Sequence, residues 1–328
     1  MRVTLGDVAE NAGVSQATAS RVLNGRGGVS HDTRSAVISA AQHLGYRRGQ
    51  TRQGRVIGVV LPELINPIFA TFGHRFATSL AQSGYTPVLC SQTVGGVSED
   101  DWVEMLLERE MAGLIVVSGH HADTLTSSDR YQRLLDRHIP LVLVNGHVDD
   151  LQAVFVSDDD HNAMRIAVAH LTELGHERIG LAAGPAYYVP VIRKVEGFSA
   201  AVKDREPLIE HSLFTIEGGR AAADALLDQG ATGIVCASDL MALGAITAAR
   251  TRGLTIPRDL SVVGYDDSPM MAFTDPALTT VRQNVPAMCN AAVRALLEQL
   301  AGRSLLRQEY LFHPELVVRG STGAVRTR

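Results

Sequence analysis

From residue 55 almost to the C-terminus, short apolar runs alternate with amphipathic helical segments. This alternation is typical of a parallel sheet covered by helices, because strands that are buried on both faces are apolar throughout. We expect eight strands, at residues 56–61, 86–90, 113–117, 141–144, 153–156, 179–183, 233–237 and 261–264. Eight strands with intervening helices exceed what one doubly wound sheet needs. The sequence therefore predicts an α/β body with two lobes of parallel sheet.

The first 46 residues have a different pattern, which predicts three short helices. Thr4, with an acid three residues later, can cap the first helix, and Gly13 ends it. Ser15 caps a second helix over residues 16–23. Ser30 caps a third, which ends at Gly45. Two short helices joined by a glycine turn form a helix-turn-helix unit.

A polar linker joins the two regions. Residues 47–54 contain no apolar side chain, so we divide the chain into a headpiece at 1–46, a linker at 47–55 and a body at 56–328. Residues 1–52 hold seven arginines and three acidic residues, a net +4, which leaves −9 on the rest of a chain of net −5. A basic end suggests contact with nucleic acid. A generally arginine-rich composition is the alternative, since Lys194 and Lys203 are the only lysines.

Motifs for catalysis, cofactors and metals are missing. Neither lysine follows a glycine, which excludes a Walker phosphate loop. Gly58 supplies one glycine where a dinucleotide fold needs three. There is no Gly-x-Ser-x-Gly or His-Glu-x-x-His motif. We therefore expect no catalytic residue, no cofactor and no metal. The three cysteines lie far apart, and we expect them to be reduced and buried.

Neither a membrane span nor a secretion signal is expected. The apolar runs fall far short of the roughly 20 residues that a spanning helix needs. The N-terminus becomes polar at once, where a signal peptide would continue with an apolar stretch. These features predict a cytoplasmic location.

Polar residues follow nearly every predicted strand of the body. In open parallel sheets, ligands bind beyond the carboxyl ends of the strands, so these residues together favour a cleft for a hydroxyl-rich or charged small molecule. Polar loop ends are common in any protein, which is the alternative for each one alone. The residues are Glu63, Ser91, Ser118, Asn145, Asp158, Ser238, Asp239, Asp266 and Asp267.

The N-terminal motif points to a specific family. Residues 8–24 (VAENAGVSQATASRVLN), 29–34 (VSHDTR) and 44–46 (LGY) resemble the DNA-binding headpiece of the lactose-repressor (LacI/GalR) family. The resemblance continues at residues 57–60, 66–69, 174–179, 237–244, 263–267 and 278–283. It implies a homodimeric transcription regulator with a body similar to a periplasmic sugar-binding protein. The lobes would be joined by crossings near residues 145–153, near 281–286 and towards the C-terminus.

The helix-turn-helix geometry and the resemblance both suggest residue roles. The start of the second helix enters the major groove in such units, and the base-reading positions here are Gln16, Ala17 and Arg21. The resemblance assigns phosphate contacts to Thr4, Ser15, Ser20, Asn24, Ser30 and Thr33, although Thr4 and Ser15 also serve as caps. We expect the effector site to include Asn66, Phe69, Asp158, Arg193, Lys194, Phe214, Ser238, Asp239 and Asp266.

Two positions depart from the family pattern. Lys194, with Arg193 alongside, stands where the family usually has arginine, and a lysine cannot make a bidentate fork. The linker is also short and lacks the alanine and leucine of the family's hinge helix. We therefore expect no leucine wedge in the minor groove, and we place Arg47, Arg48 and Arg52 along DNA phosphates. A tether that touches nothing is the alternative.

These features together predict a ligand-responsive, sequence-specific DNA-binding repressor of carbohydrate or related small-molecule metabolism genes. The expected partners are operator DNA, a sugar-like or charged effector and a second copy of the chain, with no membrane partner. A sugar-binding transport receptor and an enzyme of small-molecule metabolism are the alternatives.

Overall fold

The computed structural model describes residues 3–23, 28–44, 56–92, 95–203, 206–303 and 308–325. The chain divides into two compact units, Met1–Gly54 and Arg55–Arg328. The first unit is the headpiece and the second is the body, and each has its own hydrophobic core.

The headpiece contains three helices, α1 (Leu5–Asn11), α2 (Gln16–Leu23) and α3 (His31–His43). Gly13 connects the first two with φ of +65°, a left-handed conformation that favours glycine. The helices contribute small apolar side chains to one core, which holds Val8, Ala9, Ala19, Val22, Val37, Ala40 and Ala41.

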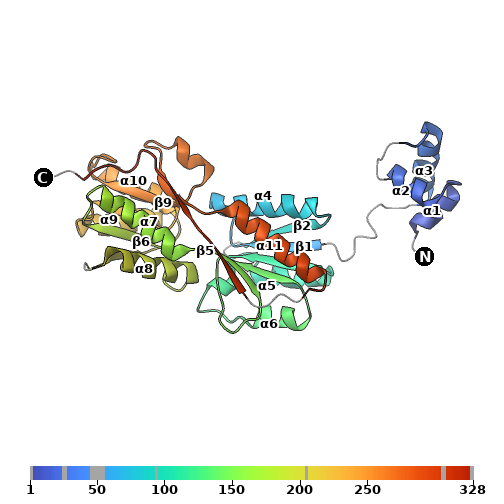
Figure 1. Cartoon of the computed structure of the whole chain (residues 1–328), viewed down its shortest axis with the longest axis horizontal. Coiled ribbons are helices and arrows are strands. Elements are labelled where there is room, and N and C mark those ends of the chain that lie inside the picture. Colours follow the sequence, from blue (N-terminus) through green and yellow to red (C-terminus); the bar gives the residue numbers. More distant parts are fainter. Residues whose placement is uncertain are drawn as a thin grey trace. The chain divides into compact units, whose positions relative to one another are not determined.

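The body has two lobes, each built on a six-stranded sheet (Figure 1). The first lobe contains the parallel sheet β11-β5-β4-β3-β1-β2. Its strands are β1 (Val56–Leu61), β2 (Thr86–Ser91), β3 (Gly113–Val117), β4 (Leu141–Val144), β5 (Val154–Asp158) and β11 (Gln308–Phe312). Its helices are α4 (Pro67–Gln82), α5 (Glu99–Glu108), α6 (Asp129–Asp136), α11 (Val285–Leu300) and the 3₁₀ turn η1 (His120–Ala122).

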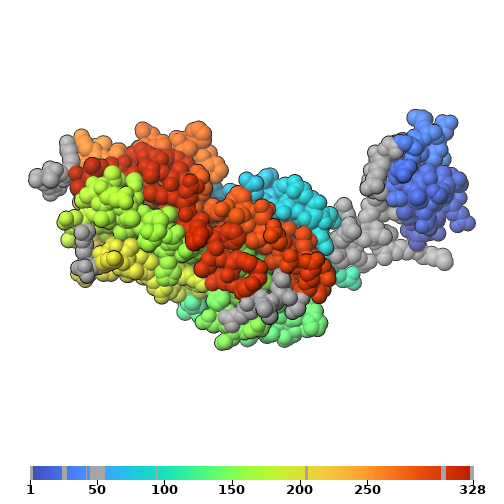
Figure 2. Space-filling view, viewed as in Figure 1, coloured from blue at the N-terminus to red at the C-terminus, as the bar shows by residue number. Residues whose placement is uncertain are grey.

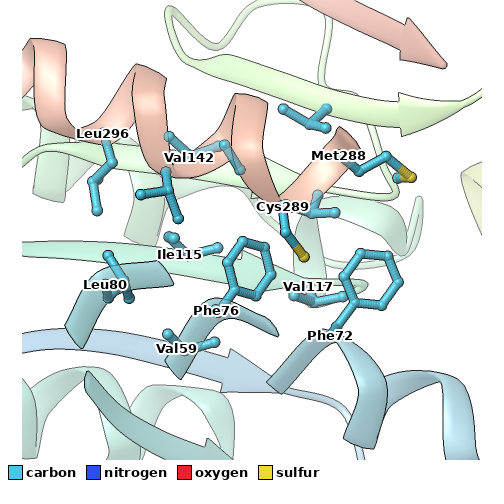
Figure 3. Packing of buried hydrophobic residues seen from close by; sticks show 14 of the residues in the cluster. Val59, Phe72, Phe76, Leu80, Ile115, Val117, Val142, Met288, Cys289 and Leu296 are labelled. Atoms are coloured by element: carbon cyan, nitrogen blue, oxygen red, sulfur yellow. The ribbon is translucent and has the colours of Figure 1, made fainter. Parts of the chain in front are cut away.

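Helices cover both faces of this first sheet. Helices α4 and α11 pack on one face, where Phe72 and Phe76 of α4 lie opposite Met288 and Cys289 of α11 (Figure 3). Helices α5 and α6 cover the other face, with Tyr131 among the buried side chains. Successive strand residues point to opposite faces, which explains why the runs predicted as strands are apolar throughout.

The second lobe contains the sheet β12-β10-β9-β8-β6-β7, in which only β12 is antiparallel. Its strands are β6 (Ile179–Ala183), β7 (Leu208–His211), β8 (Gly233–Cys236), β9 (Ser261–Asp266), β10 (Thr279–Arg282) and β12 (Glu315–Val317). Helices α7 (Asp160–Glu173) and α8 (Val189–Val202) cover one face. Helices α9 (Ile216–Asp228) and α10 (Asp239–Thr251) cover the other, near the 3₁₀ turn η2 (Pro269–Phe273).

The chain passes between the lobes three times, and the first crossing differs from the prediction. Strand β5 still pairs with β4 in the first sheet, so the crossing follows β5, at residues 158–160, instead of lying at 145–153. The apolar run at 154–156 extends the first sheet before the chain leaves it. The other crossings lie at residues 283–284, between β10 and α11, and at 313–314, between β11 and β12.

The C-terminal segment therefore belongs to both lobes. In Figure 1 its red strands run from one lobe to the other, and in Figure 2 the red and orange surface extends over both lobes on the face in view. Four strands, β7, β10, β11 and β12, were not expected from the sequence. Each is short or carries polar side chains, and β7, β11 and β12 lie at sheet edges.

All three cysteines, Cys90, Cys236 and Cys289, are free and buried, as predicted. Among the described residues, no helix combines the length and apolar character needed to cross a bilayer.

Candidate functional site

Helix α2 presents an exposed polar face. Gln16, Ala17 and Arg21 are exposed on it, whereas Ala19 and Val22 are buried in the headpiece core. The helical period places residues 16, 17 and 21 on the side opposite the core. The three predicted base-reading side chains are therefore free to contact another molecule together.

Four predicted phosphate-binding hydroxyls lie at helix N-termini: Thr4 at α1, Ser15 at α2, and Ser30 with Thr33 at α3. Thr4 and Asp7 form a capping box on α1, with the Asp7 N–H donating to Thr4 Oγ1 at 3.3 Å. Ser15 Oγ accepts from the Thr18 N–H at 3.1 Å, and Ser30 Oγ accepts from the N–H of Thr33 at 3.3 Å. Helix N-termini attract anions because their N–H groups and dipole carry partial positive charge. These hydroxyls therefore cap helices and remain exposed or half-buried beside those N-termini.

The other predicted phosphate contacts are Ser20, Asn24 and three linker arginines. Ser20 lies half-buried on α2. Asn24 and the linker arginines Arg47, Arg48 and Arg52 lie outside the described residues.

A pocket of about 250 Å³ lies between the lobes of the body, and both lobes contribute to its wall. It opens beyond the carboxyl ends of β1, β3, β4, β8 and β9, where the parallel-sheet rule places ligands. The first lobe lines it with Pro62, Glu63, Asn66, Ile68, Phe69, Ser118, Ala122 and Asn145. From the first crossing onward, the lining residues are Asp160, Tyr188, Pro190, Val191, Lys194, Phe214, Ala237, Ser238, Tyr265, Asp266 and Gln283.

Three lining residues at strand ends have a left-handed backbone. The φ angles are +46° for Ser118, +58° for Asn145 and +120° for Asp266. Such conformations are costly for residues other than glycine and cluster at ligand sites, where the surrounding fold enforces them. Phe214 also depends on its backbone surroundings, because a Cβ at Gly184 would lie 2.2 Å from its ring.

A buried network of charges surrounds Lys194. The Lys194 ammonium pairs with the Asp160 carboxylate, and both side chains are nearly buried. The ammonium also lies 3.9 Å from the centre of the Tyr265 ring. The Tyr265 hydroxyl donates to Asp158 at 2.7 Å and is 3.2 Å from Asp160. Burial raises the pKa of Asp158 to about 7, although the hydrogen bond from Tyr265 opposes this shift.

Two further carboxyl groups occupy strand and helix ends in the second lobe. Asp266 accepts from Gln283 Nε2 at 2.6 Å, and burial together with the neighbouring Asp239 raises its pKa well above the ordinary value. Asp239 accepts from the Ser268 N–H and the Thr280 hydroxyl, each at 2.7 Å. Burial raises the pKa of Asp239 to about 6. These acids share one low-dielectric region, where neutral forms are favoured.

The structure brings six of the predicted effector residues to the pocket: Asn66, Phe69, Lys194, Phe214, Ser238 and Asp266. It does not bring Asp158, Arg193 and Asp239 to the lining. Asp158 and Asp239 bind neighbouring side chains and backbone behind the pocket wall. Arg193 faces another direction from Lys194, because adjacent residues on a helix are about 100° apart.

Sequence reasoning missed Asp160, Gln283 and Tyr265 as pocket residues. Asp160 is the last residue of the first crossing, Gln283 lies in the second, and Tyr265 is on β9. Correct placement of the first crossing at residues 158–160 would have identified Asp160 as a candidate.

Direct contacts also join the two lobes outside the pocket. Arg193 on α8 makes a bidentate pair with Glu309 on β11, with distances of 2.7 and 3.0 Å. Asp123 and Tyr188 form an isolated antiparallel bridge. Next to it, the N–H and hydroxyl of Thr124 donate to the Tyr187 carbonyl at 2.9 and 2.8 Å. The observed arrangement of the lobes is therefore held by contacts that an opening motion would break.

Comparisons with known proteins agree with this architecture. The family model "Bacterial regulatory proteins, lacI family" matches residues 4–49, and a "Periplasmic binding protein-like domain" matches residues 168–322. The HTH-type transcriptional regulator reg1 of Streptomyces lividans is 53% identical, covering 99% of this chain and 98% of the relative.

Two solved structures have the same organisation. The transcriptional regulator CelR in complex with cellobiose has a TM-score of 0.72 and 30% identity, covering 98% of this chain and all of the other. The lac repressor dimer, bound to operator and the anti-inducer ONPF, has a TM-score of 0.79 and 28% identity, covering 99% of this chain and all of the other.

Proposed function

Because the chain belongs to the lacI family of bacterial regulatory proteins, we propose that a sugar-type molecule in its interlobe pocket controls how tightly its headpiece binds operator DNA. The chain is a DNA-binding transcription regulator and not an enzyme. A transport receptor is not favoured, because it would have no use for the helix-turn-helix unit. We infer the division into headpiece 1–46, linker 47–55 and body 56–328.

One observation carries this proposal: the pocket takes its wall from both lobes. A ligand that contacts both lobes stabilises the arrangement in which both sets of contacts exist, and so shifts the population of the body towards it. In a dimer, the lobe arrangement would set the separation of the two headpieces, and with it the affinity for two half-sites. Ligand and operator binding would then be coupled reciprocally.

We propose that α2 reads bases through Gln16, Ala17 and Arg21. Glutamine can bind adenine in a bidentate manner, and arginine can do so with guanine. Thr4, Ser15, Ser20, Asn24, Ser30 and Thr33 would bind phosphates, as would Arg47, Arg48 and Arg52. We further propose that the regulator is a homodimer, since one headpiece covers one half-site. It would repress carbohydrate-related genes and act in the cytoplasm.

The test measures DNA binding and its response to sugars together. Full-length protein selects its binding sequence from a random duplex pool, and fluorescence anisotropy then gives the dissociation constant for the selected duplex. We expect a roughly two-fold symmetric site and a change of at least tenfold in affinity when cellobiose, maltose or another binding sugar is added. A protein that selects no sequence would contradict the assignment of α2. A protein that binds its site with equal affinity at saturating sugar would contradict the proposed control.

A further inference from the structure

The charged side chains that line the pocket are mostly acidic. Glu63, Asp160 and Asp266 contribute carboxyl groups, and Lys194 is the only positively charged side chain among the described lining residues. Burial raises the pKa of both Glu63 and Asp266. An ionised carboxylate repels an anion, and a carboxyl group that burial keeps protonated carries no positive charge, so none of these acids offers an anionic ligand a cation. A phosphate or carboxylate on a ligand would therefore depend on Lys194.

Lys194 is already engaged. Its side chain is 6% exposed and pairs with Asp160, which is 5% exposed. The Tyr265 ring lies against the same ammonium, with 3.9 Å between the nitrogen and the ring centre. An anion that took Lys194 would leave the buried Asp160 carboxylate without its cation, and an unpaired buried charge is strongly destabilising. Lys194 therefore balances Asp160 and is not available as an anion-binding group.

Helix N-termini could bind an anion without any lysine, but at three of those beside the pocket an N–H is already bonded within the chain. Asn66 caps α4 by accepting from the Ile68 N–H at 3.3 Å, and Ser238 caps α10 by accepting from the third helical N–H at 3.2 Å. At α8, Pro190 has no N–H, and the Val191 N–H donates to the Tyr188 carbonyl at 2.9 Å. Some of the backbone N–H groups that would hold a phosphate are thus already bonded.

The pocket instead offers acceptors. Gln283 is 6% exposed and lines the pocket, and its Oε1 has no hydrogen-bond partner within the described part of the chain. A buried acceptor without a donor costs free energy until a donor arrives. A ligand hydroxyl can donate to Gln283 Oε1, whereas a phosphate dianion or a carboxylate cannot.

We propose that the pocket admits uncharged, hydroxyl-rich ligands and rejects their phosphorylated or carboxylated counterparts. The Asp160–Lys194 pair carries this selectivity, since it leaves no free cation among the described residues that line the pocket. The inference rests on the proposed function, which makes this pocket the effector site, and it narrows the effector to neutral saccharides or polyols.

The test uses matched pairs of sugars that differ by one anionic group: glucose and glucose 6-phosphate, trehalose and trehalose 6-phosphate, cellobiose and cellobionate, maltose and maltobionate. Titration calorimetry on the full-length protein measures each dissociation constant. We expect at least one neutral member to bind. The dissociation constant of its anionic counterpart should be at least about 30-fold higher. An anionic member that binds as tightly as its neutral partner would overturn the inference but leave sugar control intact. If no member binds or changes DNA affinity, the proposed function fails, and the inference fails with it.

A variant separates charge from shape. Asp160→Asn frees Lys194, so the ratio of anionic to neutral affinity should rise at least tenfold, as expected for a new charge-assisted hydrogen bond. The double variant Asp160→Asn with Lys194→Gln keeps similar shapes without the cation, and it should restore the wild-type ratio. An unchanged ratio in a folded Asp160→Asn protein would show that anions are excluded by shape and would overturn the role of the pair. If that variant does not fold, the wild-type pairs still decide the inference.

Discussion

The bidentate pair between Arg193 and Glu309 is expected to clamp the lobes in the ligand-binding arrangement. The two side chains are 20% and 16% exposed, and they join α8 of one lobe to β11 of the other. Hydrogen bonds to charged groups contribute about 1.5–3 kcal/mol, and partial exposure to solvent reduces this to about 1–2 kcal/mol. Arg193→Gln should therefore weaken sugar binding by about 5–30-fold at most. In this variant a larger fraction of molecules would have separated lobes, which must close before sugar binds.

Calorimetry with a sugar that binds the wild-type protein measures this effect, and a double-mutant cycle with Glu309→Gln isolates the pair. The matched control is Arg252→Gln, which breaks a pair of 2.6 Å with Asp228 inside the second lobe. That variant should keep its sugar affinity. Equal affinity in the wild-type protein, Arg193→Gln and Glu309→Gln would refute the clamp, and so would an equal loss in the control.

Three further predictions concern the headpiece, the pocket and pH. Arg21→Ala and Gln16→Ala should each cost about 1–3 kcal/mol of discrimination between the selected DNA site and its point variants. Ser30→Ala should instead lower affinity evenly across DNA sequences. Fluorescence anisotropy measures both effects, and an unchanged sequence preference in both base-reading variants would contradict the assignment. Asp266→Asn should weaken sugar binding at least tenfold and leave operator affinity within a few-fold. A variant whose operator affinity still responds fully to the same sugar concentration would place the ligand elsewhere. Because burial raises the pKa of Asp158 from 3.8 to about 7, the folded protein keeps a proton that the unfolded chain releases, and this stabilisation is lost as the pH rises towards 7. Asp158→Asn should therefore lose less stability than the wild-type protein between about pH 4 and 7 in urea unfolding, and an equal or steeper loss would contradict this prediction.

The strands that the sequence predicted and those that it missed differ in where their partners lie. Central strands such as β3 and β4 are buried on both faces, so their own residues identify them. Strand β11 has the sequence QEYLF, with exposed side chains, and pairs with β5, about 150 residues earlier in the chain. No local pattern reveals such a partner, because edge strands are only partly buried and can be polar. The first crossing lies after β5 for a different reason, because β5 pairs with β4 in the first sheet.

Part of the pocket lining was predicted from the sequence. The sequence does not reveal which side of a helix faces the pocket, or which distant side chains pair with each other. Strand ends located Ser118, Asn145 and Asp266 because ligands bind at the carboxyl edge of parallel strands. The sequence could not decide whether Arg193 or Lys194 faced the ligand. The two side chains leave α8 about 100° apart. Lys194 therefore pairs with Asp160, whereas Arg193 pairs with Glu309. Both partners come from distant segments, so the choice depends on tertiary packing.

Two of the crossings contact the pocket directly, so a ligand can act on the segments that join the lobes without intervening residues. Asp158 and Asp160 belong to the first crossing and bind Tyr265 and Lys194, which line the pocket. Gln283 belongs to the second crossing and binds Asp266. A ligand hydroxyl that engages Asp266 or Gln283 therefore acts directly on a segment that joins the lobes. Coupling requires an element with two arrangements that the ligand biases, and these two crossings have the contacts for it. The third crossing, at residues 313–314, does not line the pocket, and it should follow the motion imposed by the other two.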